Sequence, residues 1–226
     1  MGISRLRDFW RASKNLMIRI IIADDHDIVR QGLNQIVAGV PDMVVCGEAE
    51  TAEEALGLVR TKPCDVLVLD ITLPGKSGLE ILKDLKQIRP DLPVLILSIH
   101  SEDEYAVRVL KAGAAGYMTK RAVAKDLITA IRKVVEGGKY ISPAVAEKLA
   151  FSLSADVTKP PHETLSDREY QVMLMIAKGY SLAGIADELA LSEKTISTYR
   201  ARILEKMHMQ KNAEIIRYAL QNKLVD

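Results

Sequence analysis

Five short apolar runs, each followed by a stretch with helical spacing, dominate the first half of the chain. The runs are Ile18–Ala23, Met43–Cys46, Val66–Leu69, Val94–Leu97 and Gly116–Met118. Continuous Ile, Val and Leu runs are typical of strands buried on both faces, and the stretches between them suit helices that cross from one strand to the next. We therefore predict five βα units that form a doubly wound parallel α/β sheet with helices on both faces.

The alternation of strand-like and helix-like patterns ends after residue 138. A helix is predicted over Ala144–Ser152, and a linker with a proline pair and small polar residues follows it up to Glu163. No strand-like run occurs beyond Leu165, where four short helical patterns remain. We therefore predict an N-terminal extension, an α/β domain, a helix with its linker, and a small all-α domain of four helices, over residues 1–16, 17–138, 139–163 and 164–226.

Charge and composition exclude several classes of function. The 226 residues include 31 basic and 30 acidic side chains, so binding to nucleic acid would need a local basic patch. No stretch approaches about 18 uninterrupted apolar residues, and we expect neither a transmembrane helix nor a membrane partner. Cys46 and Cys64 lack the CxxC spacing, and the histidines form no HExxH motif. A zinc site and a disulfide framework are therefore not expected, and the cytoplasm is the expected compartment.

Polar side chains stand at the ends of four predicted strands. Asp24 and Asp25 follow the first strand, Asp70 the third, Ser98 the fourth and Lys120 the fifth. The carboxyl ends of parallel strands meet at one edge of the sheet, where ligands bind. Three carboxylates at this edge would repel one another unless a cation lay between them, and a set of oxygen ligands favours Mg²⁺.

The same side chains suit phosphoryl transfer, which needs positioning and charge neutralisation more than covalent help. Asp70 is the predicted acceptor, because it alone is followed by a stiff loop, Ile71-Thr72-Leu73-Pro74-Gly75. The backbone carbonyl of Thr72 would complete the metal shell, while Lys120 and the Ser98 hydroxyl would contact the phosphoryl oxygens. Taken singly, each aspartate has a simpler interpretation as a helix cap or turn residue. The combination of residue types at the strand ends favours a site.

Residues 17–138 resemble the receiver domain of bacterial two-component response regulators, which has a flavodoxin-like fold. The matching residues are Asp24-Asp25, Asp70 within Leu69-Asp-Ile-Thr-Leu-Pro-Gly, Ser98, and Lys120 preceded by Tyr117.

This resemblance implies that a sensor histidine kinase transfers a phosphoryl group to Asp70. It also implies that Asp25 and Asp70 hold Mg²⁺, with Asp24 acting through water. In the family, a switch follows phosphorylation: Ser98 moves toward the phosphoryl group, and Tyr117 rotates inward. A half-buried aromatic side chain at a strand end is otherwise simply part of the core.

The C-terminal segment contains a predicted helix-turn-helix. Ser166 and Glu169 form a capping box at the start of its first helix, and Ser181 and Ser192 begin the next two. Two short helices joined by a tight turn place the second in the DNA major groove. From Lys194 onward seven basic and three acidic residues give a local charge of +4. We expect the DNA contacts to come from Lys194, Thr195, Ser197, Thr198, Ala201, Arg202 and Lys206.

Residues 165–226 are similar to the LuxR-type DNA-binding domain, through Leu165-Ser-Asp-Arg-Glu, Ala177-Lys-Gly, Ile185-Ala186 and Leu191-Ser-Glu-Lys-Thr195-Ile196. With the receiver, this identifies the chain as a member of the NarL/FixJ class of response regulators. The resemblance places base contacts at Ser197, Thr198 and Ala201. An ordinary solvated helix face is the alternative, and Glu205 on the same stripe suits it better than it suits DNA.

The last predicted helix, capped by Asn212, has more apolar surface than one small bundle can bury. We expect it to pair two chains across a two-fold axis on an inverted repeat of double-stranded DNA, through Ile215, Ile216, Ala219 and Leu220.

The leading hypothesis is a transcription regulator, not an enzyme, in which the receiver covers the recognition helix until phosphorylation of Asp70 releases it and favours a homodimer. One alternative is a DNA-binding regulator that ignores phosphorylation and uses the receiver only for dimerisation. A second is an Mg²⁺-dependent phosphatase, but Thr72 stands where such an enzyme needs a second acid.

Overall fold

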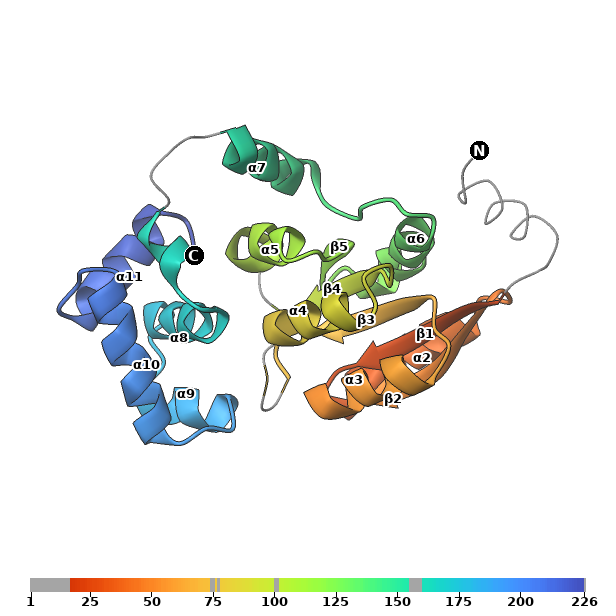
Figure 1. Cartoon of the computed structure of the whole chain (residues 1–226), viewed down its shortest axis with the longest axis horizontal. Helices are drawn as coiled ribbons and strands as arrows, with labels where there is room; N and C mark the ends of the chain where they lie inside the picture. The colour runs from red at the N-terminus through yellow and green to blue at the C-terminus, as the bar shows by residue number, and fades with distance from the viewer. Residues whose placement is uncertain (1–16, 74–75, 77, 100–101, 155–159, 226) are drawn as a thin grey trace.

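The computed structural model describes residues 17–73, 76, 78–99, 102–154 and 160–225 (Figure 1). The predicted extension over residues 1–16 and the middle of the predicted linker lie outside this range. Among the described residues, no helix has both the length and the apolar character needed to cross a membrane.

A five-stranded parallel sheet forms the centre of the first domain, as predicted. Its strands are β1 (Ile18–Ala23), β2 (Met43–Ala49), β3 (Val66–Asp70), β4 (Val94–Ser98) and β5 (Gly116–Thr119). They lie in the order β2-β1-β3-β4-β5, so the chain reverses direction across the sheet between β1 and β3. Ligands of open α/β sheets bind at such a reversal, beyond the carboxyl ends of the strands.

Helices cover both faces of the sheet, and the alternation of side chains along each strand separates the two cores. Ile20 and Ile22 of β1 pack with α2 (Asp27–Ala38) and α6 (Val123–Val135). Ile21 and Ala23 belong to the opposite core, with α3 (Ala52–Thr61), α4 (Gly78–Ile88) and α5 (Glu102–Lys111). Because β1 is apolar on both sides, it can lie only in the interior of the sheet.

Helix α7 (Pro143–Ser154) follows the sheet domain, packs against α5, and extends the predicted helix by one residue at its start and two at its end. A short 3₁₀ turn, η1 (Pro161–Thr164), then leads into the second domain.

The C-terminal domain consists of α8 (Asp167–Ala177), α9 (Leu182–Glu188), α10 (Glu193–Lys206) and α11 (Asn212–Gln221). The predicted capping box is confirmed: the Ser166 hydroxyl accepts from the Glu169 amide at 3.3 Å, and the Glu169 carboxylate accepts from the Ser166 amide at 2.8 Å. Every residue of α8 is buried, because α9, α10 and α11 cover it within its own domain and the first domain contacts it at Asp167, Arg168 and Tyr170.

The predicted cap of α11 is wrong. Lys211 precedes the helix without a capping hydrogen bond from its side chain, and Asn212 is the first helical residue. The Asn212 side-chain oxygen instead accepts a hydrogen bond of 2.6 Å from Nε of Arg200, so this amide ties α11 to α10.

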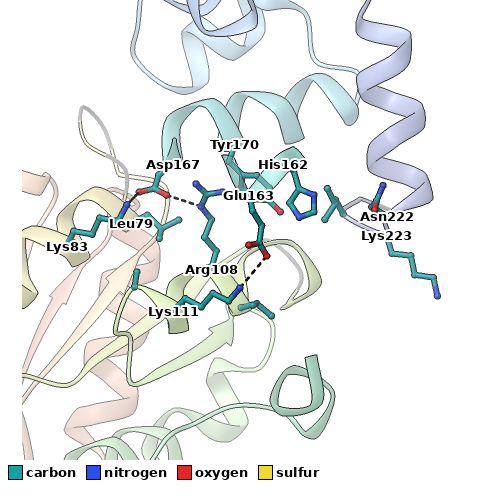
Figure 2. Close-up of a pocket in the computed structure, with 13 residues that line it drawn as sticks. Leu79, Lys83, Arg108, Lys111, His162, Glu163, Asp167, Tyr170, Asn222 and Lys223 are labelled. Carbon is teal, nitrogen blue, oxygen red and sulfur yellow. Dashed lines mark hydrogen bonds and ion pairs between the residues drawn. The ribbon is translucent and has the colours of Figure 1, made fainter. Parts of the chain in front are cut away.

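The two domains meet where α4 and α5 face the beginning of α8 (Figure 2). The Asp167 carboxylate accepts from Lys83 Nζ at 2.6 Å and from Arg108 Nε at 2.9 Å. Arg108 also donates to the carbonyl of Leu165, and its guanidinium lies 4.6 Å from the centre of the Tyr170 ring. The interface therefore combines ion pairs with apolar and aromatic contacts, because Leu79 of the receiver and Leu165 of the second domain belong to one buried cluster.

Candidate functional site

Four of the predicted site residues come together at the carboxyl edge of the sheet. Asp24 directly follows β1, Asp70 ends β3, Ser98 ends β4, and Lys120 directly follows β5. The Lys120 ammonium lies 2.7 Å from Oδ2 of both Asp24 and Asp70, whose residues are only 1% and 2% exposed. The structure thus has one cation between two buried carboxylates, as the strand-end argument requires.

The charges at this edge depend on one another. Burial raises the pKa of the Asp70 carboxyl, the Asp24 charge adds to the rise, and the Lys120 charge offsets part of it. Burial lowers the pKa of Lys120, but Asp70 and Asp24 outweigh it, and the pKa of the ammonium is raised overall. Lys120 therefore stays charged, and the cleft can accommodate more positive charge beside Asp70.

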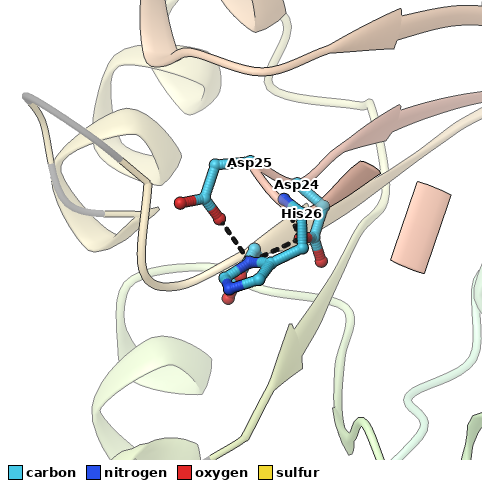
Figure 3. A group of neighbouring side chains, drawn as sticks. Asp24, Asp25 and His26 are labelled. Carbon is cyan, nitrogen blue, oxygen red and sulfur yellow. Dashed lines mark hydrogen bonds and ion pairs between the residues drawn. The ribbon is translucent and has the colours of Figure 1, made fainter. Parts of the chain in front are cut away.

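Asp25 and His26 complete a cluster of possible metal ligands with Asp24 and Asp70. Figure 3 shows the first three of these side chains, Asp24, Asp25 and His26, beside one another. One ligand atom from each of the four lies within 4.8 Å of the others. His26 Nδ1 is 2.7 Å from Asp25 Oδ1 and 3.3 Å from Asp24 Oδ1, and the His26 amide donates to the same Asp24 oxygen. The sequence reasoning missed His26, although its position next to the aspartate pair was a signal that it would lie here.

Two buried oxygens at this edge lack an aligned hydrogen-bond donor among the described residues. They are Asp24 Oδ2, which has only the Lys120 charge beside it, and Thr72 Oγ1. The Thr72 amide donates to Asp70 Oδ1 at 3.0 Å, which holds the backbone of the predicted metal loop against the acceptor. Carboxylate oxygens that still have lone pairs without a hydrogen bond are suitable ligands for a hard divalent cation such as Mg²⁺.

The predicted switch residues occupy neighbouring strand ends. The Lys120 amide donates to the Ser98 carbonyl at 2.7 Å, and Ser98 is completely buried. Tyr117, two residues before the end of β5, is 1% exposed and packs in the core on the side of α4 and α5. Its ring therefore lies in the interior in this conformation.

Gly78 joins α4 closely to the strand end that carries Asp70. Its amide donates to the Ile71 carbonyl at 2.9 Å, and an added Cβ would lie 2.6 Å from the Asp70 carbonyl oxygen. Only glycine permits so close an approach. Because Lys83 on the same helix contacts Asp167, α4 connects the carboxylate site to the domain interface.

The predicted DNA-contact residues lie on α10, and most are accessible. Five of them are exposed and form no ion pair within the described part of the chain: Lys194, Ser197, Thr198, Ala201 and Arg202.

The other two predicted contact residues take part in contacts within the domain. Thr195 is half-buried, and its amide donates to the capping Ser192 hydroxyl at 3.1 Å. Lys206 is exposed, but its ammonium donates to Glu169 at 2.6 Å, so its charge already has a partner inside the domain.

Two expectations about surfaces need correction. The first domain does not cover α10 in this conformation, because its contacts go to α8 and leave the predicted DNA face exposed. In α11, Ile215 and Ala219 are completely buried within the domain and offer no dimer surface. Leu220 is 51% exposed and Ile216 is partly exposed, so only these two of the four predicted residues remain available to a partner.

Comparison with known proteins agrees with this architecture. Residues 20–132 match the response regulator receiver domain, and residues 163–219 match the bacterial regulatory proteins of the luxR family. The chain belongs to the response regulators of the NarL/FixJ class, and it is a DNA-binding regulator of a two-component system rather than an enzyme.

Its relatives match along nearly the whole chain. Response regulator GacA of Pseudomonas aeruginosa is 39% identical over 211 residues, covering 93% of this chain and 99% of GacA. Response regulator UvrY of Escherichia coli K12 is 35% identical over 209 residues, covering 92% of this chain and 96% of UvrY.

Solved structures of RcsB share both domains. RcsB from Salmonella typhimurium superposes with a TM-score of 0.58 at 25% identity, covering 90% of this chain and 99% of RcsB. A complex of RcsB with DNA superposes with a TM-score of 0.56 at 25% identity, covering 92% and 99%.

Proposed function

We propose that the chain is a phosphorylation-dependent transcription regulator in which Asp70 accepts a phosphoryl group from a sensor histidine kinase. The observation that carries this proposal is the Lys120 ammonium, 2.7 Å from both of the buried carboxylates of Asp24 and Asp70 at the carboxyl edge of the sheet. That arrangement leaves a carboxylate nucleophile next to a fixed positive charge. Phosphoryl transfer needs both.

In this reaction an Asp70 carboxylate oxygen attacks the phosphorus of the kinase phosphohistidine, the P–N bond breaks, and the imidazole leaves. Lys120 neutralises charge on the phosphoryl oxygens, and Ser98 at the neighbouring strand end approaches them. Asp24, Asp25, Asp70 and the Thr72 carbonyl would hold Mg²⁺, which supplies further charge neutralisation.

Transmission of the signal follows from chain connectivity. Helix α4 begins eight residues after Asp70, and α5 begins four residues after Ser98. Both helices contact the beginning of α8, α4 through Lys83 and α5 through Arg108. We infer that phosphorylation shifts the positions of α4 and α5, with Ser98 and Tyr117 as the moving side chains, and thereby weakens their contacts with Asp167.

Because the predicted DNA-contact face of α10 is accessible, weaker contacts between the domains would change the position of the C-terminal domain rather than uncover this face. Because the contact residues are already exposed, phosphorylation need not uncover them. It instead frees the C-terminal domain to take the position that an inverted repeat of double-stranded DNA requires, with two recognition helices about 34 Å apart. We propose that Leu220 and Ile216 of two chains meet in the resulting homodimer, and that the regulator acts in the cytoplasm, where chromosomal DNA is available.

The experiment is DNA binding to a genomic fragment pool with and without beryllofluoride, which mimics the aspartyl phosphate. The proteins are the wild type, Asp70→Asn, and the control Asp91→Asn, which changes an exposed aspartate in the loop before β4. Tighter dimeric binding with beryllofluoride is expected in the wild type and the control, and is expected to be absent in Asp70→Asn. Equal binding in every sample would instead support a regulator that uses its receiver only for dimerisation.

A further inference from the structure

A cavity of about 590 Å³ lies between the two domains (Figure 2). One side is formed by α4 and α5 of the receiver, and the other by η1, the beginning of α8 and the residues that follow α11. The phosphoryl site lies at the strand ends and shares none of the residues that line this cavity. Cavities of roughly 300–1,000 Å³ at domain interfaces are the usual locations of small-molecule sites.

The walls are partly apolar and partly aromatic. Leu79 and Val107 line the receiver side, and Tyr170 and Leu224 line the other side. The His162 ring extends the aromatic wall: its centre lies 6.0 Å from that of Tyr170, and its Nδ1 is 2.8 Å from the Tyr218 hydroxyl. A flat apolar group would therefore find surfaces to pack against.

The polar groups of the cavity have an excess of positive charge. Four basic and two acidic side chains line it, a net charge of +2. The Asp167 carboxylate forms ion pairs with both Lys83 and Arg108, so one negative charge is shared between two positive charges. Lys223 has no ion-pair partner among the described residues, whereas Lys111 lies 3.3 Å from Glu163.

His162 adds no charge to the cavity near neutral pH. Burial lowers the pKa of its imidazole, the nearby charges of Arg108 and Lys111 lower it further, and Glu163 opposes them. The cavity therefore combines an aromatic wall with two unmatched positive charges.

We propose that this interdomain cavity binds a small organic anion with an apolar, aromatic body. The ring would pack between His162 and the half-buried side chains of Val107 and Ala112, because Tyr170 is only 3% exposed and its ring is already covered by Arg108. The acid group would lie near the excess positive charge. Such a ligand contacts both domains at once, so its binding stabilises their contact. The proposal concerns the unphosphorylated protein and does not depend on phosphoryl transfer.

The probe for the test is 8-anilinonaphthalene-1-sulfonate, an aromatic anion whose fluorescence rises in apolar surroundings. Titration into the full chain should show saturable binding of one molecule per chain. N-phenyl-1-naphthylamine, which has the same rings without the sulfonate, should bind at least about tenfold more weakly. Absence of saturable binding by the sulfonate, or equal affinity for the neutral compound, overturns the proposal.

Variants locate the bound probe. Ala112→Trp places a large ring in the cavity and should weaken binding at least about tenfold. Lys223→Glu reverses an unpaired charge without breaking an ion pair and should weaken binding about threefold to tenfold. The control Lys125→Glu makes the same charge change at an exposed position on α6 and should leave affinity within about twofold. Unchanged affinity in Lys223→Glu, or an equal loss in Lys125→Glu, overturns the proposal even if Ala112→Trp fails to fold.

Discussion

The contact between Asp167 and Arg108 should contribute measurably to holding the domains together. Asp167 is the first residue of α8, and its side chain is 6% exposed. Of its two partners, the side chain of Arg108 is 22% exposed and that of Lys83 is 56% exposed. A partly buried, charge-assisted hydrogen bond contributes about 1–2 kcal/mol, and an ion pair as exposed as the one with Lys83 about 0.5 kcal/mol. Asp167→Asn should therefore destabilise the closed arrangement by about 1.5–2.5 kcal/mol, a factor of about 10 to 70 in the equilibrium.

A double-mutant cycle isolates this contact. The free energy of unfolding of α8 in urea, followed by its amide NMR signals, is compared for the wild type, Asp167→Asn, Arg108→Gln and the double variant. The coupling energy should be about 1–2 kcal/mol. Asp187→Asn, which changes an exposed aspartate on α9, serves as the control and should have an effect within about 0.5 kcal/mol. A coupling energy below about 0.3 kcal/mol, or an equal loss in the control, would refute the reasoning.

Three further predictions concern other parts of the chain. Gly78→Ala should destabilise the receiver by about 1–3 kcal/mol in thermal unfolding, because the added Cβ would collide with the backbone of β3 and the loop after it. Gly57→Ala, which has open space in the middle of α3, should instead stabilise the receiver by about 0.5–1 kcal/mol. Equal effects of the two substitutions would contradict the steric argument. Burial lowers the pKa of His162 in the folded chain, so the contribution of this residue to stability is present above the unfolded pKa and is lost as the pH falls below about 6.5. The His162→Gln variant should therefore lose less stability than the wild type between about pH 7 and pH 5. The same pH profile in both proteins would count against this assignment. Lys194→Ala should reduce the steepness of log K against log salt concentration by about 0.9 if Lys194 contacts a phosphate, and an unchanged slope would exclude that contact.

The sequence predicted the sheet and its carboxylates well for a physical reason. Strands buried on both faces have an unmistakable apolar pattern, and parallel strands place their final residues at one edge whatever their order in the sheet. The convergence of Asp24, Asp70, Ser98 and Lys120 thus follows from the locations of the apolar runs. His26 was missed because the strand-end argument looked for carboxylates, although this histidine directly follows the aspartate pair.

Apart from the cap of α11, the expectations that failed concern contacts between elements rather than the elements themselves. The apolar period of α11 shows that Ile215 and Ala219 are buried, but it does not say whether the same chain or a second one covers them. The position of the receiver depends on ion pairs between residues about 60 to 80 positions apart, such as Arg108 with Asp167. Such pairs leave no periodic signal in a single sequence. Domain placement and the accessibility of α10 could therefore be determined only from the structure.

The polar character of the domain interface has a consequence for how the molecule behaves after the domains part. The interface side of α8 carries Asp167 and Arg168, and the opposing helices carry Lys83, Glu80 and Arg108. Beside these charges, Leu79 and Tyr105 of the receiver belong to the same buried cluster as Leu165 and Tyr170 of the second domain. Separation therefore exposes apolar side chains together with the charged ones. Dissolved ions also screen the attraction between the charged groups, with a Debye length of about 8 Å at physiological ionic strength. A rise in ionic strength should accordingly weaken the charged part of the interface and leave its apolar part in place.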